Sequence, residues 1–439
     1  MGAPTSASAR IRRTFEDPLV QRAASEGNRV VLGPGEPAFT EWAAAGLQLP
    51  DLDAMQDYRV GRIQQELVAC DLVGALLFDP MNLMYATNAP NMQLWFTHNE
   101  ARWLWVPAEG PLILFDYPAC DFLSAHNPLI AEVRPTNCFT YFLAGQRGDE
   151  KAALFAGEIA ELVREAGGGR IAADPMPVHG VQALQAEGLE LVDAMTVMER
   201  ARAIKGPDEL LAMRCSLEAA RVACRRMFEA LRPGISEQEL WAVLWAEMFA
   251  RGGDWMECRL LSAGPRTNPW FQECSSYVIQ EGDLVAFDTD LVGSYGMMVD
   301  ISRTWICGGG PLDDDQRHVY ELARRQIEDN IHLLRPGVTF RELCHDSQKP
   351  SVDDYRHYSV LFHGVGQCDE WPSITFPESW DEFGYDGVLE AGMVLTVESY
   401  VGAYAGGQGV KLENQVLVTE DGPENLSPWS LEPDDFDDC

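Results

Sequence analysis

Leu-Arg-Pro-Gly-Ile-Ser-Glu-Gln-Glu-Leu at residues 231–240 returns at residues 334–343 as Leu-Arg-Pro-Gly-Val-Thr-Phe-Arg-Glu-Leu, with six of the ten positions identical. Each copy reads as a turn between two helices, because both have the spacing of a capping box, Ser236 with Glu239 and Thr339 with Glu342. Pro-Gly turns are common, so an accidental match between two ordinary connections is the alternative. Strand-rich sequence follows each copy, which favours a duplicated helix–helix–sheet unit. Such a duplication would place a site on a pseudo-two-fold axis, with ligands from both halves.

The chain of 439 residues is long enough for two domains. Residues 1–50 are rich in Pro, Gly and Ala, and we interpret them as an arm over the surface or over a neighbouring subunit. Residues 51–201 alternate helical patterns with short apolar strands, which is typical of an α/β domain. A second domain, residues 202–439, is expected to begin with a helix whose first residue is Pro207.

Composition narrows the classes of partner. The chain has 33 basic and 68 acidic residues, a formal charge of −35, which argues against nucleic acid and anionic membrane surfaces as partners. No apolar run approaches the roughly 18 residues of a membrane span, and no apolar segment follows the two arginines near the start, so no signal peptide is expected. Eleven cysteines without a CxxC pair fit reduced thiols. The expectation is a cytoplasmic protein.

Three aspartates are expected on one hairpin. Residues 285–290 read as a strand that presents Asp288 and Asp290 on the same face, and a second strand at 297–305 brings Asp300 back towards them. Burying adjacent carboxylates costs several kcal/mol unless a cation compensates their charge. Aspartates that cap turns at strand ends are the structural alternative. Three of them on one hairpin, amid apolar residues, favour a metal site.

Three further ligand candidates lie downstream, namely His363, Glu398 and Glu413. Taken singly, each could be a core histidine or an ion-paired carboxylate. Together with the aspartates they form a set of five carboxylates and one imidazole, which suits two divalent transition-metal ions such as Fe, Mn, Co or Zn.

Residues 200–425 resemble the pita-bread superfamily of creatinase, aminopeptidase P and methionine aminopeptidase. The shared motifs include Ile-Lys-Gly-Pro-Asp-Glu, Asp-Ile-Ser-Arg-Thr, His-Gly-Val-Gly, Gly-Met-Val-Leu-Thr-Val-Glu and Val-Lys-Leu-Glu. The preceding 150 or so residues resemble the creatinase-type N-terminal domain. The resemblance implies an α+β, creatinase-like two-domain protein with a pita-bread catalytic domain. It also implies a homodimer, in which loops of the N-terminal domain reach the partner's active site.

Two histidines of the peptidases in this superfamily are missing here. The stretch 268–274, where one is expected upstream of the aspartates, contains no histidine, and the position seven residues beyond His363 is Glu370. A working proline peptidase is therefore not expected. An Xaa-Pro peptidase or another amidohydrolase stays the alternative enzyme, and a silent binding protein is the third hypothesis.

The Asp-x-Asp pair, the segment 363–372 and the intervals of 35 and 15 residues that link His363, Glu398 and Glu413 resemble the DddP-type dimethylsulfoniopropionate lyases. This resemblance implies β-elimination of a zwitterionic sulfonium substrate to dimethyl sulfide and acrylate. It also implies iron, whereas residue types alone do not distinguish iron from zinc, manganese, cobalt or nickel.

The resemblance indicates the catalytic base, and the chemistry of the side chains indicates further residues that could contact the substrate. Asp369 matches the position that this lyase type is thought to use as its base, with a turn-capping aspartate as the alternative. Tyr358 is an orienting hydroxyl or aromatic wall, unless it packs in the core. Aromatic faces that could hold the sulfonium, for about 0.5–2 kcal/mol, are Trp95 with Phe96, or Trp270 with Phe271. Any one of the 12 tryptophans is more often a core residue.

Overall fold

The computed structural model describes residues 33–89, 92–118, 120, 123–124 and 127–436, which form two compact units. The first contains residues 50–202, and the second contains residues 33–49 and the chain from residue 203 onward. Residues 1–32 of the predicted arm lie outside the described residues, whereas helix α2 (Ala38–Ala44) packs Trp42 on Tyr295 of the second unit, with ring centroids 5.6 Å apart. None of the described helices has the length and apolar character that a membrane span needs.

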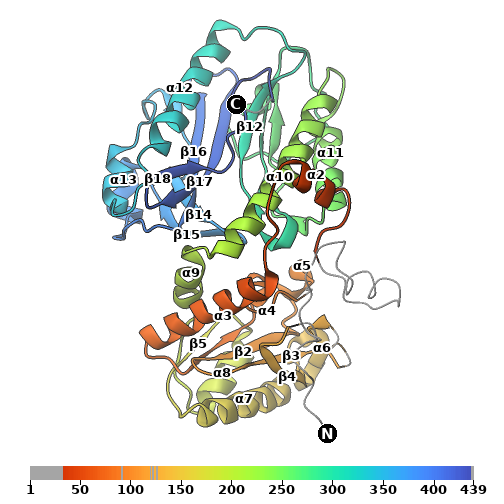
Figure 1. Cartoon of the computed structure of the whole chain (residues 1–439), viewed down its shortest axis with the longest axis vertical. Helices are drawn as coiled ribbons and strands as arrows, with labels where there is room; N and C mark the ends of the chain where they lie inside the picture. The colour runs from red at the N-terminus through yellow and green to blue at the C-terminus, as the bar shows by residue number, and fades with distance from the viewer. Residues whose placement is uncertain (1–32, 90–91, 119, 121–122, 125–126, 437–439) are drawn as a thin grey trace. The chain divides into compact units, whose positions relative to one another are not determined.

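The N-terminal unit has helices on both faces of a mixed sheet of six strands (Figure 1). The strands, in sheet order, are β4 (Ile130–Pro135), β3 (Leu112–Asp116), β2 (Trp103–Pro107), β1 (Gly74–Leu77), β5 (Ile171–Ala173) and β6 (Leu191–Asp193). The helices are α3 (Leu52–Ala69), α4 (Pro80–Thr87), α5 (Gln93–Phe96), α6 (Tyr141–Ala144), α7 (Gly148–Glu165), α8 (Val178–Ala186) and α9 (Met195–Ala203).

Alternate residues of β1 enter different cores, because a strand projects successive side chains to opposite faces. Ala75 and Leu77 belong to the cluster that α3, α4 and α9 complete. Leu76 belongs to the cluster that α7 and α8 complete. Both faces of this strand are buried, which explains why it reads in the sequence as one continuous apolar run.

The second unit is built on a large sheet whose strand pairs are antiparallel. The main path runs β15 (Asp369–Ile374), β14 (Phe362–Val365), β16 (Val394–Ala403), β17 (Val410–Thr419), β12 (Ser302–Ile306), β9 (Leu284–Asp288) and β8 (Leu261–Ala263). Two short strands extend it, β13 (Tyr355–Arg356) on β16 and β18 (Gly422–Asn425) on β17. A smaller sheet contains β11 (Met298–Val299), β10 (Leu291–Val292) and β7 (Trp255–Met256).

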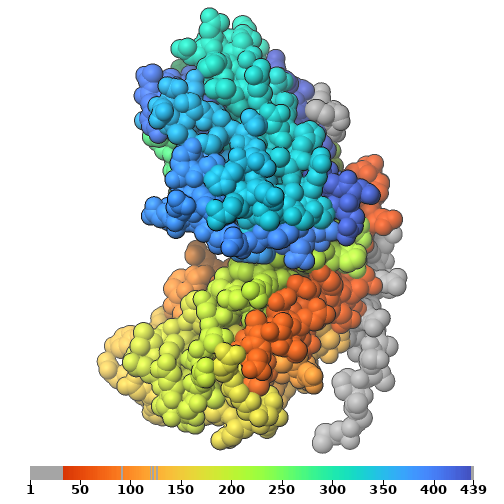
Figure 2. Space-filling model, turned by 90° about the vertical axis from the view of Figure 1, so that its left-hand side faces the viewer, coloured from red at the N-terminus to blue at the C-terminus, as the bar shows by residue number. Residues whose placement is uncertain are grey.

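Helices pack on this sheet in pairs. They are α10 (Pro207–Ala230) with α11 (Glu237–Ala250), and α12 (Asp314–Ile331) with α13 (Phe340–Asp346), followed by the short α14 (Trp380–Phe383). Buried residues of α12 and α13 form one core cluster with residues of β14, β16 and β17. The outer surface of these two helices and of the segments around them is visible in cyan and blue in Figure 2.

Equivalent contacts in both halves confirm the internal repeat. Ser236 caps α11 through a capping box and pairs with Val278 in an isolated bridge. Thr339 caps α13 in the same way and pairs with Val388. Residues 231–240 and 334–343 therefore make the same cap and the same bridge in their two halves, and an accidental match does not explain this.

The repeat also relates ligand candidates of the two halves. Gly282 and Gly392 have similar left-handed backbones, with φ of 83° and 93°, just before β9 and β16 respectively. Asp288 lies on β9 six residues after the first glycine, and Glu398 lies on β16 six residues after the second. The duplication thus places a carboxylate at the same position of two related strands.

The aspartate hairpin differs from its prediction in two places. The expected strand 285–290 is too long: β9 ends at Asp288, and Asp290 has a left-handed backbone with φ of 33°. The expected strand 297–305 is broken at Asp300, whose N–H donates to the Gln415 side chain at 3.1 Å and not to a strand ladder. A side chain thus satisfies the backbone N–H at the break, so the aspartate can leave the plane of the sheet.

Candidate metal centre

A row of polar side chains crosses four adjacent strands of the large sheet. Asp288 of β9 pairs with Ser302 of β12, Ser302 pairs with Glu413 of β17, and Glu413 pairs with Glu398 of β16. Residues directly opposite one another in a sheet project to the same face. The strand register therefore brings three of the predicted ligands together from both halves of the repeat.

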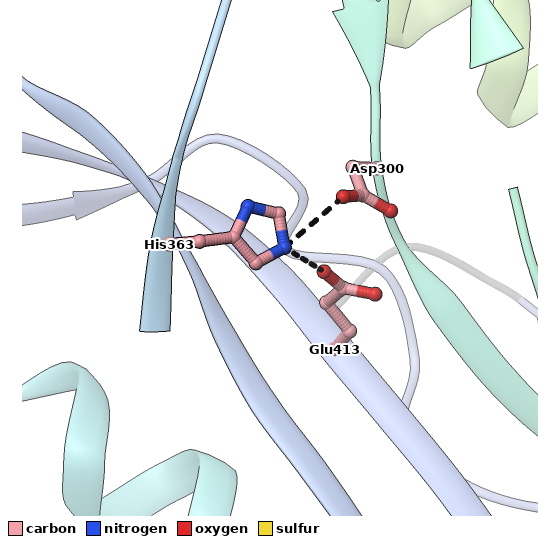
Figure 3. A group of neighbouring side chains, drawn as sticks. All are labelled: Asp300, His363 and Glu413. Carbon is pink, nitrogen blue, oxygen red and sulfur yellow. Dashed lines mark ion pairs between the residues drawn. The ribbon is translucent and has the colours of Figure 1, made fainter. Parts of the chain in front are cut away.

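His363 and Asp300 complete this group (Figure 3). The Nε2 atom of His363 lies 3.2 Å from Glu398, 3.4 Å from Asp300 and 3.9 Å from Glu413. Its Nδ1 atom lies 3.0 Å from the carbonyl oxygen of Gly364. An Nδ1–H that donates to this carbonyl leaves the Nε2 lone pair facing the carboxylates, which is the tautomer that a metal ligand requires.

Five of the six predicted ligands fall into two groups that share Asp300, and the sixth, Glu398, lies against His363. One group is Asp288, Asp290 and Asp300, the other is Asp300, His363 and Glu413, and within each group the ligand atoms lie within 4.8 Å of one another. A ligand common to two groups is what a pair of neighbouring cations needs. The left-handed backbone of Asp290 is the local feature that brings its side chain into the first group, although β9 has already ended.

The metal-free centre is electrostatically unfavourable. Burial raises the pKa of both Asp288 and Glu413 to about 7, with neighbouring carboxylates adding to the effect. The pKa of Asp300 is raised well above its ordinary value for the same reasons. Burial lowers the pKa of His363, but Glu398, Asp369 and Glu413 outweigh it and raise that pKa to about 10. A proton or a cation is needed here at neutral pH.

Two buried carboxylate oxygen atoms are available to bind metal ions. Within the described part of the chain, Asp300 Oδ1 and Glu413 Oε1 have no hydrogen-bond partner. A buried charged oxygen without a partner costs more than the roughly 1–3 kcal/mol of a neutral one. Hard oxygen donors with one imidazole are a donor set that divalent transition metals accept. The residues present therefore fit a pair of divalent cations.

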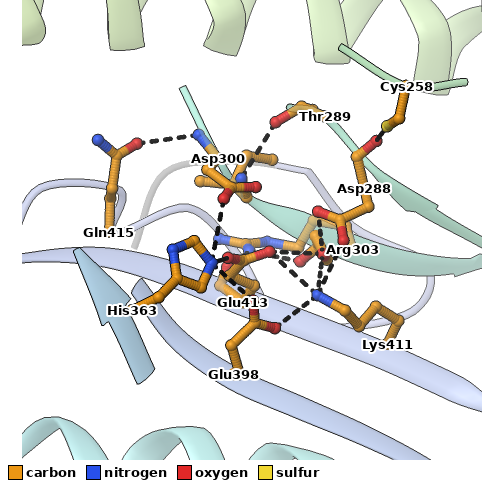
Figure 4. Close-up of polar contacts among 12 residues, drawn as sticks. Cys258, Asp288, Thr289, Asp300, Arg303, His363, Glu398, Lys411, Glu413 and Gln415 are labelled. Atoms are coloured by element: carbon orange, nitrogen blue, oxygen red, sulfur yellow. Dashed lines mark hydrogen bonds and ion pairs between the residues drawn. The ribbon is translucent and has the colours of Figure 1, made fainter. Parts of the chain in front are cut away.

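Lys411 is the member of the centre that sequence reasoning missed (Figure 4). Its Nζ atom lies 2.6 Å from Glu398, 3.1 Å from both Asp288 and Glu413, and 2.8 Å from the hydroxyl of Ser302. The pKa of Lys411 is raised well above its ordinary value, because the three carboxylates outweigh the effect of burial. Its position two residues before Glu413 on one strand was the available signal, since such residues share a face.

Asp369 lies at the start of β15, beside the centre and not inside it. Its side chain is 60% exposed, and one carboxylate oxygen lies 3.8 Å from Nδ1 of His363. Partial burial of the carboxylate raises the pKa of Asp369, with His363 acting against it and the charge of Asp290 adding to it. A solvent-accessible carboxylate next to the candidate metal ligands suits a group that takes a proton from a small substrate.

The predicted aromatic residues lie in different environments, some near the candidate centre, one in a core and one in the N-terminal unit. The Tyr358 ring has Lys411 Nζ 4.4 Å from its centroid, and it stacks on Phe271 at 5.1 Å with the planes 13° apart. Phe271 is 58% exposed and has a left-handed backbone with φ of 71°. Trp270 is buried and stacked on Tyr400, which fits the core-packing alternative. Trp95 lies on α5 of the N-terminal unit, and its role stays a prediction.

Glu370 occupies the position at which the second peptidase histidine is expected, and it forms an ion pair with Lys205. Its carboxylate lies 2.6 Å from Nζ of Lys205, and both side chains are buried. The other carboxylate oxygen accepts the backbone N–H of Gln367 at 3.0 Å. The position that carries a histidine in the related peptidases is thus part of a buried ion pair.

Models of two known families cover most of the chain. The model of the creatinase/prolidase N-terminal domain matches residues 59–204, and that of metallopeptidase family M24 matches residues 212–420. The structure is also similar to an Xaa-Pro dipeptidase from Bacillus anthracis, with a TM-score of 0.69, 22% identity and coverage of 86% of this chain and 99% of that one. These matches confirm the predicted creatinase-like two-domain fold.

Two curated proteins match nearly the whole chain. The dimethylsulfoniopropionate lyase DddP of Roseovarius nubinhibens is 45% identical over 425 residues, which are 94% of this chain and 95% of that protein. The chain belongs to the DddP family. The DddP protein of Roseobacter denitrificans is 43% identical, with 92% and 93% covered. By contrast, the Xaa-Pro dipeptidase of Lactobacillus helveticus is 30% identical over 241 residues, which are 52% of this chain and 61% of that protein.

Proposed function

We propose that this chain cleaves dimethylsulfoniopropionate to dimethyl sulfide and acrylate. The observation that carries the proposal is the 45% identity to a DddP lyase over 95% of that lyase's length. The geometry supports it, because five of the predicted ligands lie in two groups that share Asp300, Glu398 lies 3.2 Å from His363, and Asp369 lies beside them. We further propose two divalent metal ions, iron among the candidates, and a homodimer in the cytoplasm that needs neither nucleic acid nor membrane.

The reaction is an elimination that begins with removal of a weakly acidic proton. In this proposal, Asp369 takes the proton from the carbon next to the substrate carboxylate. The electron pair of the C–H bond forms the new C=C bond, and the C–S bond breaks with its pair left on sulfur. The products are neutral dimethyl sulfide, acrylate and the proton now held by Asp369. When bound, the metal ions would supply positive charge that stabilises the charge developing on the substrate carboxylate.

Tyr358 is assigned to orientation through its hydroxyl. One face of its ring meets the ammonium group of Lys411 and the ring also stacks on Phe271, so little of it is left for a sulfonium. Burial and the charge of Glu398 raise the pKa of Tyr358, so the phenol stays protonated at neutral pH. A protonated phenol can donate a hydrogen bond to the substrate carboxylate.

Phe271 is assigned to the sulfonium end, because its ring is stacked on Tyr358 yet remains 58% exposed. We expect Phe271→Ala to raise KM for dimethylsulfoniopropionate by between about twofold and 30-fold, which corresponds to the loss of roughly 0.5–2 kcal/mol of cation–π attraction. Phe271→Leu retains apolar volume without the ring, and Phe271→Trp retains a ring. All three variants keep a Cβ atom on the left-handed backbone, so its strain is common to them. If the leucine variant binds as well as the wild type, the ring does not recognise the sulfonium.

Gas measurement and metal analysis test the function itself. We expect purified protein loaded with Fe²⁺ or Zn²⁺ to release dimethyl sulfide from dimethylsulfoniopropionate, with one acrylate for each dimethyl sulfide. Xaa-Pro dipeptides serve as the competing substrates, and we expect no hydrolysis because Glu370 is held by Lys205. Hydrolysis of a dipeptide without release of gas would instead assign the chain to the peptidase chemistry of its fold.

A further inference from the structure

We propose that Lys411 is a positioning residue of the metal centre, a built-in cation that holds Asp288, Glu398 and Glu413 in place for the bound ions. The inference rests on the metal dependence of the proposed function and adds to it a residue whose role the sequence did not reveal. The contacts of the Nζ atom determine which carboxylate oxygens stay available to the ions, and they reduce the negative charge that the ions must balance.

The geometric part concerns which oxygen of each carboxylate is used. Lys411 contacts Oε2 of Glu398, Oδ2 of Asp288 and Oε2 of Glu413. The other oxygen of Glu398 faces Nε2 of His363 at 3.2 Å, and the other oxygen of Glu413 has no hydrogen-bond partner in the described part of the chain. One oxygen of each glutamate is thus tied to the lysine, which leaves the second oxygen turned toward the histidine side of the centre.

The electrostatic part concerns the charge that the ions must balance. Five ligand carboxylates carry five negative charges, and Lys411 supplies one positive charge in contact with three of them. The remaining four negative charges equal the charge of two divalent cations. Without Lys411 the ions would leave the buried centre with an uncompensated charge, which is costly in a protein interior.

The surroundings of Lys411 show that its charge is fixed in place. The side chain is fully buried on β17, Ser302 bridges it to Asp288 and Glu413, and the Tyr358 ring lies over its ammonium group. Four polar contacts and an aromatic face around one ammonium group are expected for a lysine that acts as a fixed cation, and not for one that only fills space.

This role predicts different effects in the metal-free and metal-loaded protein. In the metal-free protein Lys411 offsets the charge of Asp288, Glu398 and Glu413, whereas in the loaded protein the ions share that task. We therefore expect Lys411→Met to lower the Tm of the metal-free second unit by about 5–15 °C, and to lower the Tm of the Zn²⁺-loaded protein clearly less. The Tm gain on adding Zn²⁺ should accordingly be larger in the variant than in the wild type.

The experiment compares thermal unfolding of chelator-treated and Zn²⁺-loaded full-length protein for three variants. Lys411→Arg retains the charge and should restore most of the metal-free Tm. The double variant Lys411→Met with Glu398→Gln removes one cation and one anion, and it should be more stable without metal than Lys411→Met alone. If the single variant does not fold without metal, the double variant still provides a metal-free Tm that tests the proposal. Equal Tm losses in both states, or no rescue by the double variant, would overturn the proposal. Because no lyase assay is involved, failure of the proposed function would leave this outcome unaffected.

Discussion

Asp369→Asn is expected to lower kcat for dimethyl sulfide release by a factor of about 100 to 10,000, the range that a general base typically contributes. The amide has the size of the carboxylate but cannot accept the proton of the substrate carbon. Asp369 lies outside the two groups of converging ligands, so we expect the variant to bind as much metal as the wild type. Headspace gas measurement gives the rate, and elemental analysis of the same sample gives the metal content.

The metal content separates the roles that Asp369 could have. Loss of activity with full metal content identifies the base, whereas loss of metal would make Asp369 a ligand. Full activity would place the base elsewhere and leave Asp369 as an ordinary residue at the start of β15. Asp386→Asn is the matched control, since it makes the same chemical change at an exposed loop residue of the same unit, and it should leave kcat unchanged.

The grouping of the candidate ligands could be predicted from the sequence, because several of them occur in patterns that a protein interior tolerates only around a positive charge. Aspartates two residues apart beside apolar residues, with a third aspartate expected on the same hairpin, are costly unless a cation is present. The strand assignment around them was less successful. Asp290 has a left-handed backbone, and Asp300 lies at a break where a distant glutamine side chain takes its N–H, and neither feature has a local sequence signal.

Lys411 and the aromatic residues show a second limit of sequence reasoning. A lysine is usually a solvated surface residue, so the one signal for Lys411, its place two residues before Glu413 on the same strand, does not by itself predict burial among carboxylates. Trp270 and Phe271 are neighbours in the chain, yet one ring is packed on Tyr400 and the other is open to solvent. Phe271 also has a left-handed backbone, a feature that the sequence around it does not indicate.

Glu413→Gln is expected to abolish lyase activity and to reduce the bound metal from two ions per chain to one or none. Glu413 is fully buried, its Oε2 accepts from Ser302 and contacts Lys411, and its unpartnered Oε1 lies toward His363. The amide fills the same space but removes the charge. We expect kcat to fall by more than about 1,000-fold, because the centre loses positive charge at the developing negative charge of the substrate. Metal titration by calorimetry and headspace gas measurement check both effects.

The stability of this variant should move in the direction opposite to its activity. The pKa of Glu413 is raised to about 7 by burial and by Glu398, so at neutral pH and above the ionised side chain weakens the metal-free fold relative to the unfolded chain. A neutral glutamine avoids this cost, and we expect the metal-free variant to keep or raise its Tm at pH 8. The wild type should gain Tm with Zn²⁺, and the variant should gain little or nothing.

Glu420→Gln, an exposed change just after the same strand, should behave as the wild type. A variant that loses Tm without metal yet still binds two ions would show that Glu413 supports the fold and not the metal centre.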